Sequence, residues 1–218
     1  METEIKLKFN DKDSLYGVAS LDSFRTLITD SNDPCPVLLE NYYLDTIDHK
    51  LSCRTGMLRI RHYASSGRDD YEFTLKYGGG IVNGLHRRFE WNLKSSSGNF
   101  SINEFKSKVT GNDPDGLLDE AFKDIEDSDL YVICSNCFNR TVYNISYGKS
   151  TAEACFDYGK ILSRDRSRTE DICELELELK TGELKDIEEL AESLISETGC
   201  VPFSSTKFVR TLALANGG

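Results

Sequence analysis

Long apolar runs and several common catalytic motifs are absent from this sequence of 218 residues. No segment approaches the ~18 consecutive apolar residues that a membrane-spanning helix needs, and charged residues begin at position 2, so no secretory leader is predicted. Gly78–Gly80 is glycine-rich, but no GK[ST] follows, and HExxH and GxSxG do not occur. These absences exclude the motifs of P-loop proteins, zinc proteases and serine hydrolases. We expect Gly78–Gly80 to form a flexible part of a β-hairpin.

Histidine and paired cysteine are also scarce. Cys134 and Cys137 form a single CxxC with no second pair at zinc-finger spacing, and the three histidines lie far apart. A structural zinc site is not favoured, because a lone cysteine pair supplies half of a tetrahedral shell. The odd total of seven cysteines, with no leader, favours reduced thiols and a cytoplasmic location.

Positive charge is in deficit, with 26 basic against 37 acidic side chains and a net charge of -11. This balance argues against nucleic-acid partners, which select basic surfaces. The excess of acidic side chains is concentrated in residues 112–129, with eight acids and one base, and in 183–198, with six acids and one base. Both segments lie outside the predicted strands and read as solvated faces. A small polyanion could therefore still bind elsewhere.

Period-2 alternation of apolar and polar residues is the dominant signal of secondary structure. It predicts eight strands, at residues 2–9, 37–46, 57–63, 70–77, 85–93, 137–147, 151–158 and 172–180. A helix is predicted over 183–198, ended by Gly199 and Pro202, with weaker helices over 14–29 and 115–126. No repeat or linker divides the chain, so we expect one domain over residues 1–218.

Several of these strands carry charge along one whole face. Residues 2–8 place Glu2, Glu4, Lys6 and Lys8 on one face, and 172–180 place Glu174, Glu176, Glu178 and Lys180 on one face. Consecutive carboxylates on one face stand ~6.5–7 Å apart, a repulsion that mixed signs usually relieve. For any single strand, a solvated outer face is the alternative. Segregation of acidic strands from the strand bearing Arg59 and Arg61 instead indicates a metal–polyphosphate ligand.

Eight strands can close into a barrel that has no free edges and room for one small ligand. We therefore expect an α+β fold in which a closed antiparallel eight-stranded β-barrel forms a tunnel with a hydrophilic charged interior. The apolar strand faces would then point outward and be covered by helices such as 183–198.

The order of these motifs resembles the triphosphate tunnel metalloenzymes, also called the CYTH domain superfamily. Glu2-Thr3-Glu4-Ile5-Lys6 is similar to the ExExK signature of that family. Further matching segments are Tyr42–Thr46, Met57–Arg61, Phe73–Gly80, Gly84–Asn92, Phe156–Gly159, Cys173–Gly182 and Ser205–Arg210. The chain looks most like the bacterial inorganic triphosphatase branch, without the CHAD domain that members of that branch often carry.

This resemblance implies metal-dependent hydrolysis of inorganic triphosphate to pyrophosphate and phosphate, with Mg²⁺ or Mn²⁺ as cofactor. It implies that water attacks the terminal phosphorus in line, while positioning and charge neutralisation supply most of the catalysis. A class IV-type adenylyl cyclase, a thiamine or nucleoside triphosphatase and a non-catalytic polyphosphate-binding module are the alternatives. The expected partner is a small-molecule triphosphate, with no nucleic acid or membrane, for a monomer or homodimer.

The resemblance and the charge pattern also indicate residue roles. The catalytic candidates are Glu2, Glu4, Lys6 and Glu178. The substrate-binding candidates are Lys6, Arg59, Arg61, Lys76, Arg88, Arg140 and Lys207. The metal-binding candidates are Glu2, Glu4, Glu90, Asp157, Glu174, Glu176 and Glu178, with Glu2, Glu4, Glu176 and Glu178 favoured. Lys8 and Lys180 extend the same faces, either at a tunnel mouth or as exposed strand ends.

Overall fold

The structure is a computed structural model that describes residues 3–31, 34–64, 70–82, 85–109, 113, 116–163 and 167–216, with only the backbone at 79–82 and 85–88. The strands are β1 (Glu4–Lys8), β2 (Val37–Asp45), β3 (Met57–Tyr63), β4 (Asp70–Val82), β5 (Leu85–Ser95), β6 (Tyr131–Tyr147), β7 (Ser150–Leu162), β8 (Thr169–Thr181) and β9 (Val201–Pro202). The helices are α1 (Lys12–Gly17), η1 (Val18–Ser20), α2 (Asp22–Arg25), α3 (Lys50–Cys53), α4 (Ile102–Val109), α5 (Leu117–Ala121), η4 (Asp127–Asp129), α6 (Leu184–Thr198) and α7 (Lys207–Ala215).

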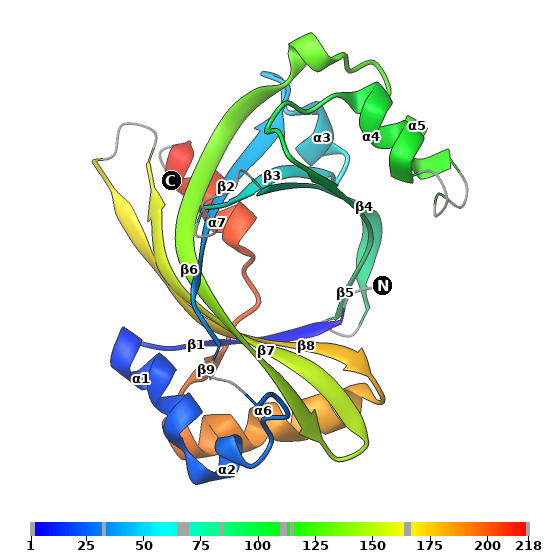
Figure 1. Ribbon diagram of the computed structural model, residues 1–218. Helices are drawn as coiled ribbons and strands as arrows, with labels where there is room; N and C mark the ends of the chain where they lie inside the picture. Colours follow the sequence, from blue (N-terminus) through cyan, green and yellow to red (C-terminus); the bar gives the residue numbers. More distant parts are fainter. Residues whose placement is uncertain are drawn as a thin grey trace.

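The strands form one antiparallel sheet in the order β5-β4-β3-β2-β6-β7-β8-β1-β9, which curves strongly around a central space (Figure 1). The prediction of a closed eight-stranded barrel is wrong. Among the described residues β5 pairs only with β4, and the far edge of β1 is occupied at Leu7 and Lys8 by the short strand β9. Within the described residues the sheet therefore has nine strands and stays open, because β5 and β1 do not pair with each other.

Each of the eight predicted segments contains a strand, and the differences lie at their ends. β4, β6 and β7 run several residues beyond the predicted limits. Gly78–Gly80, expected as a flexible hairpin element, belongs to β4, where the register shifts between Tyr77 and Gly80. Gly78 has a φ of +63° at this irregularity, a conformation that glycine adopts without steric cost.

The predicted helix over 14–29 is wrong, because this segment breaks into α1, η1 and α2. Leu21 has an extended backbone, with φ −66° and ψ +133°, and so interrupts the helical path between η1 and α2. The predicted helix over 115–126 shortens to α5. By contrast, α6 matches its prediction and ends where Gly199 adopts φ +73°. The alternation signal did not reveal α3, α4 or α7.

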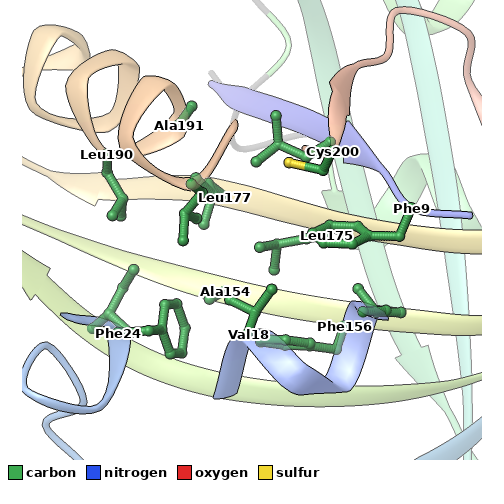
Figure 2. Packing of buried hydrophobic residues seen from close by; sticks show 14 of the residues in the cluster. Phe9, Val18, Phe24, Ala154, Phe156, Leu175, Leu177, Leu190, Ala191 and Cys200 are labelled. Carbon is green, nitrogen blue, oxygen red and sulfur yellow. The ribbon is translucent and has the colours of Figure 1, made fainter. Parts of the chain in front are cut away.

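The first hydrophobic core lies between the sheet and α6, α1 and α2 (Figure 2). Leu175 and Leu177 of β8 are fully buried there, and Leu190 of α6 is 3% exposed. These side chains alternate with the carboxylates of β8, as the sequence pattern predicts. The apolar faces of β1 and β8 therefore point away from the central space and are covered by α6, which confirms that expectation.

A second hydrophobic core covers the same outer side of β3, β4 and β5. Phe73 and Leu75 of β4 and Trp91 of β5 pack there against Phe105 of α4 and Leu118 of α5. The alternate residues of these strands, such as Arg59 and Lys76, consequently face the central space.

In the described part of the chain, no helix combines the length and the apolar character that a membrane span requires.

The C-terminal helix α7 packs on the opposite, inner face of the sheet. Its residues Phe208 and Leu212 contact the cluster around Tyr43, and Leu214 contacts the cluster around Phe138. Tyr43 and Phe138 also line the central cavity. The first turn of α7 thus forms part of the cavity wall.

Candidate functional site: a charged cavity inside the curved sheet

A cavity of about 830 Å³ lies on the inner face of the sheet. Strands β1 to β8 all contribute to its wall, so the open sheet still surrounds a common space. Of the candidate residues with described side chains, those that line it are Glu4, Lys6, Arg59, Arg61, Lys76, Glu90, Arg140, Glu176, Glu178 and Lys207. Side chains from strands far apart in sequence therefore converge on the cavity.

Two candidates on β7 and β8 do not line the cavity but lie directly behind its basic residues. Asp157 is fully buried, accepts two hydrogen bonds from Arg140 at 2.7 and 2.6 Å, and lies 2.8 Å from Lys207 Nζ. Glu174 is 1% exposed and contacts Lys207 at 2.8 Å and Arg210 of α7. Buried carboxylates so paired act as counter-ions for the bases in front of them.

Glu176 forms ion pairs with three basic side chains in the cavity wall. Its carboxylate lies 2.6 Å from Arg140 Nη2, 2.7 Å from Lys207 Nζ and 3.0 Å from Lys6 Nζ. Burial alone would raise the pKa of Glu176, but the charges of Lys207, Lys6 and Arg140 outweigh burial and hold it well below its usual range. For Lys6 the effects have the opposite sign: burial alone would lower its pKa, but the negative charges of Glu176 and Glu4 outweigh burial and raise it. All four groups are therefore charged at neutral pH.

The guanidinium groups of β3 are less well neutralised. Arg61 Nε donates to the side-chain oxygen of Asn41 at 2.8 Å. Burial, followed by the positive charges of Arg59 and Arg140, lowers the pKa of Arg61 to about 10. Arg59 Nη2 donates to Thr74 Oγ1 at 3.0 Å, while its buried Nε has no hydrogen-bond partner among the described residues. This part of the cavity therefore carries guanidinium groups whose hydrogen-bonding capacity is only partly used by the described residues, a chemistry that suits an anion.

Lys76 and Glu90 form an ion pair across β4 and β5. Lys76 Nζ lies 3.0 Å from Glu90 Oε2, and both side chains are about one-fifth exposed, at 18% and 20%. Both residues line the cavity, so this ion pair forms part of its charged wall.

A row of carboxylates runs across β7, β8 and β1. In the sheet order these strands are separated from β3, which carries Arg59 and Arg61, by β2 and β6. Glu178 of β8 faces Glu4 of β1 on one side and Glu153 of β7 on the other. Like charges directly opposite one another destabilise a sheet. Lys180 offsets this repulsion by contacting Glu153 at 2.8 Å and Glu178 at 2.7 Å, and Lys6 contacts Glu4 at 2.9 Å.

These oxygen donors suit a hard divalent cation in chemistry and charge. Throughout the part of the chain that the structure describes, no three histidine, cysteine, aspartate or glutamate side chains already converge as a ready cluster. The carboxylates point instead to their lysine partners. A cation at this row would therefore have to replace lysine contacts.

Sequence reasoning did not select several charged side chains that the structure brings to the site, among them Glu72, Glu153 and Arg210. Glu72 lies 3.6 Å from Arg59, and Glu153 belongs to the carboxylate row. Arg210 supports Glu174 from α7. The alternation of β4 and β7 placed Glu72 and Glu153 on charged faces and could have suggested them, whereas Arg210 required the position of α7.

Some expectations fall outside the described residues or concern other groups. Glu2 lies outside the described residues, and so does the side chain of Arg88, whose backbone belongs to β5. Cys134 and Cys137 are three positions apart on β6 and so project from opposite faces of the strand. They cannot share one metal ion. All seven cysteines are free thiols.

The fold resembles that of several solved structures. A Hippeastrum protein described as having a dominant triphosphatase activity matches with a TM-score of 0.64 at 18% identity, over 100% of this chain and 96% of the other. A protein from Pyrococcus horikoshii OT3 matches with a TM-score of 0.56 at 16% identity, over 99% of each chain. At these identities the likeness shows a shared fold.

Sequence comparison gives a more specific relationship. The chain is 33% identical to an inorganic triphosphatase of Haemophilus influenzae over 182 residues, which are 83% of this chain and 47% of the relative. It thus spans about half the length of that curated relative. The model of the CYTH domain matches residues 1–212, nearly the whole sequence. The chain belongs to the CYTH domain family.

Proposed function

We propose that this chain hydrolyses inorganic triphosphate to pyrophosphate and phosphate, with residues 1–218 acting as one triphosphate tunnel domain. The observation that carries this proposal is the separation of charge across one cavity. Guanidinium groups of β3 and β6 lie on one part of the wall, and the carboxylate row of β1, β7 and β8 lies on another. A metal–triphosphate complex is complementary to both parts. The named activity of the Haemophilus relative supports the same substrate.

In this proposal the basic residues bind and orient the phosphate chain. Arg59, Arg61 and Arg140 bind the non-bridging oxygens, because charge-assisted and bidentate contacts are the strongest that a protein offers to phosphate. Lys6 and Lys207 reach the same space from β1 and α7. Lys76, and Arg88 by resemblance, complete the set. Their charges offset the charge that develops as the terminal bridging bond breaks.

The acidic residues bind the cation and orient water. We propose Glu4 and Glu178 as the principal holders of Mg²⁺ or Mn²⁺, with Glu153 beside them and Glu2 and Glu176 as further candidates. When bound, the cation would act as a Lewis acid on phosphate oxygens. A carboxylate that is not occupied by the cation orients a water molecule for attack on the terminal phosphorus, and pyrophosphate leaves.

Three of the metal candidates receive a different role in this proposal. Asp157 and Glu174 are counter-ions of Arg140, Lys207 and Arg210, because their oxygens are buried and already paired. Glu90 neutralises Lys76 and lies on β5, which does not pair with β1, β7 or β8 among the described residues. These assignments leave the cation at the row formed by β1, β7 and β8.

An organic triphosphate, as in an adenylyl cyclase or a thiamine or nucleoside triphosphatase, is the second candidate substrate. It is favoured by the apolar part of the cavity wall, which includes Leu39, Tyr63 and Phe138. Such side chains could contact a base or ring attached to the phosphate chain. A non-catalytic polyphosphate-binding module would use the same basic residues without turnover.

One assay separates these functions. The purified chain is incubated with tripolyphosphate, ATP or thiamine triphosphate, each with Mg²⁺ or Mn²⁺, and the products are identified. Fastest phosphate release from tripolyphosphate is expected, and EDTA should abolish it. Arg61→Met should reduce turnover strongly, whereas Arg25→Met, at an exposed site on α2, should not. Cyclic AMP, preferred release from an organic triphosphate, or binding without turnover would contradict the proposal.

We further propose that the protein works in the cytoplasm as a monomer or homodimer on a small-molecule substrate, without nucleic acid or membrane partners. Support for the location comes from the thiols, since all seven cysteines are free in the structure and a reducing compartment keeps them so.

A further inference from the structure

Arg61 differs from the other basic residues of the cavity in the kind of partner that holds it. Lys6, Arg140 and Lys207 each contact at least one carboxylate within 3.0 Å. Within the described part of the chain, no carboxylate lies within 4 Å of Arg61. Its side-chain hydrogen bond goes to the neutral amide of Asn41, at 2.8 Å. The residue opposite Arg61 on β4, Glu72, lies 3.6 Å from Arg59 instead, so the protein orients the Arg61 guanidinium without a direct carboxylate contact.

Asn41 belongs to a buried chain of polar side chains, which we call the amide chain and define as Asn41, Asn136 and Thr211. Asn41 Nδ2 donates to Asn136 Oδ1 at 3.0 Å, and Asn136 Nδ2 donates to Thr211 Oγ1 at 2.9 Å. Thr211 Oγ1 donates in turn to the backbone oxygen of Lys207 at 2.6 Å. The three residues are 1%, 4% and 0% exposed. The amide chain thus links Arg61 on β3 to the first turns of α7.

The direction of every hydrogen bond in this chain is fixed by its two ends. Thr211 uses its one proton on the Lys207 carbonyl, so it accepts from the amide nitrogen of Asn136. The oxygen of Asn136 then faces the nitrogen of Asn41, and the oxygen of Asn41 faces Arg61, which can only donate. Flipping either amide would set donor against donor in a buried site, a costly arrangement. The chain therefore presents an acceptor to Arg61.

We propose that the amide chain is a positioning device that fixes Arg61 for a substrate phosphate while leaving its positive charge available. This inference rests on the proposed function, in which Arg61 binds phosphate. A carboxylate at position 41 would hold Arg61 equally well but would compete with the substrate for its charge. The neutral amide of Asn41 orients Arg61 without competing with the substrate for its positive charge. Because Thr211 lies on α7, correct seating of that helix also supports the position of Arg61.

The first test replaces the neutral acceptor with a charged one of the same shape. Asn41→Asp should raise the KM for tripolyphosphate about tenfold or more, with a much smaller change in kcat, because a contact to the bound substrate is weakened. Asn139→Asp is the matched control, since Asn139 is exposed on β6 and receives the same change in charge. A folded Asn41→Asp variant with an unchanged KM would overturn the inference.

A double-mutant cycle keeps the inference testable if Asn41→Asp does not fold. Asn41→Leu removes the acceptor, Arg61→Met removes the donor, and the third variant carries both changes. If Asn41 acts through Arg61, the double variant should bind tripolyphosphate within about twofold of Arg61→Met alone. Additive losses of affinity would show that Asn41 acts independently of Arg61 and would overturn the inference.

A spectroscopic readout distinguishes positioning from general stability. In ¹⁵N-labelled wild-type protein the Arg61 Nε–H signal should be protected from exchange by its hydrogen bond. Asn41→Leu should remove that protection, while the signals of the hydrophobic core keep theirs. Unchanged protection at Arg61 would contradict the role assigned to Asn41.

The cycle also separates this inference from the proposed function. If the wild-type protein binds tripolyphosphate without hydrolysing it, and the cycle is non-additive by calorimetry, the proposed function fails and the inference stands. If the wild-type protein hydrolyses tripolyphosphate but the losses are additive, only the inference fails. A wild-type protein that neither hydrolyses nor binds tripolyphosphate overturns both.

Discussion

Asp157 offers the sharpest test of how this cavity is built, because it can be either a counter-ion or a metal ligand. The structure buries Asp157 completely between Arg140 and Lys207, with contacts of 2.6 to 2.8 Å. Removing one partner of a buried ionic network costs about 3–5 kcal/mol, because the remaining charges stay buried and unpaired. Asp157→Asn keeps the shape of the side chain but removes its charge. It should therefore destabilise the protein even without metal.

The assay is thermal unfolding in EDTA, which removes any contribution from a bound cation. For a chain of this length 1 kcal/mol corresponds to roughly 2–4 °C in Tm, so Asp157→Asn should lower Tm by about 6–20 °C. Asp171→Asn is the matched control. Asp171 pairs with Lys160 at 2.8 Å, but the two side chains are 68% and 58% exposed, and exposed pairs contribute about 1 kcal/mol or less.

The two roles give opposite results. If Asp157 were a metal ligand, its replacement would leave the Tm in EDTA nearly unchanged. The variant would instead lose the rise in Tm that Mg²⁺ or Mn²⁺ produces in the wild-type protein. That pair of observations would refute the assignment of Asp157 as a counter-ion.

Two further predictions concern the carboxylate row and the outer core. Glu4→Gln should lower metal-dependent turnover of tripolyphosphate at least about 100-fold, measured as phosphate release, with Glu189→Gln on the exposed side of α6 as control. Near wild-type activity of Glu4→Gln would remove β1 from the metal site. Leu190→Ala should destabilise the fold by about 2–5 kcal/mol in urea unfolding, because Leu190 is 3% exposed against β8. Ile47→Ala, at a side chain that is 78% exposed, should cost far less, and an equal loss from both variants would contradict the packing of α6.

The sequence by itself determined the faces of the strands. In β8 a two-residue period sets Leu175 and Leu177 against Glu176 and Glu178, and successive side chains of a strand must point to opposite sides. The apolar side therefore needs a cover, and the apolar stripe of α6 supplies one. The same periodicity identified most of the charged side chains that line the cavity, because a charged face that is not solvated must surround something polar.

Only the tertiary structure decided closure and pairing. Alternation carries no information about which strand edges meet, so it could not reveal that β1 pairs with β8 and the short β9 while β5 pairs only with β4 among the described residues. Nor could it distinguish Glu178, which lines the cavity, from Glu174, which lies behind Lys207, although both share one face of β8. That distinction depends on α7, which brings Lys207 and Arg210 to Glu174 across more than thirty residues of sequence. Burial and charge partners are properties of the assembled fold, and they decide which carboxylates remain available to a ligand.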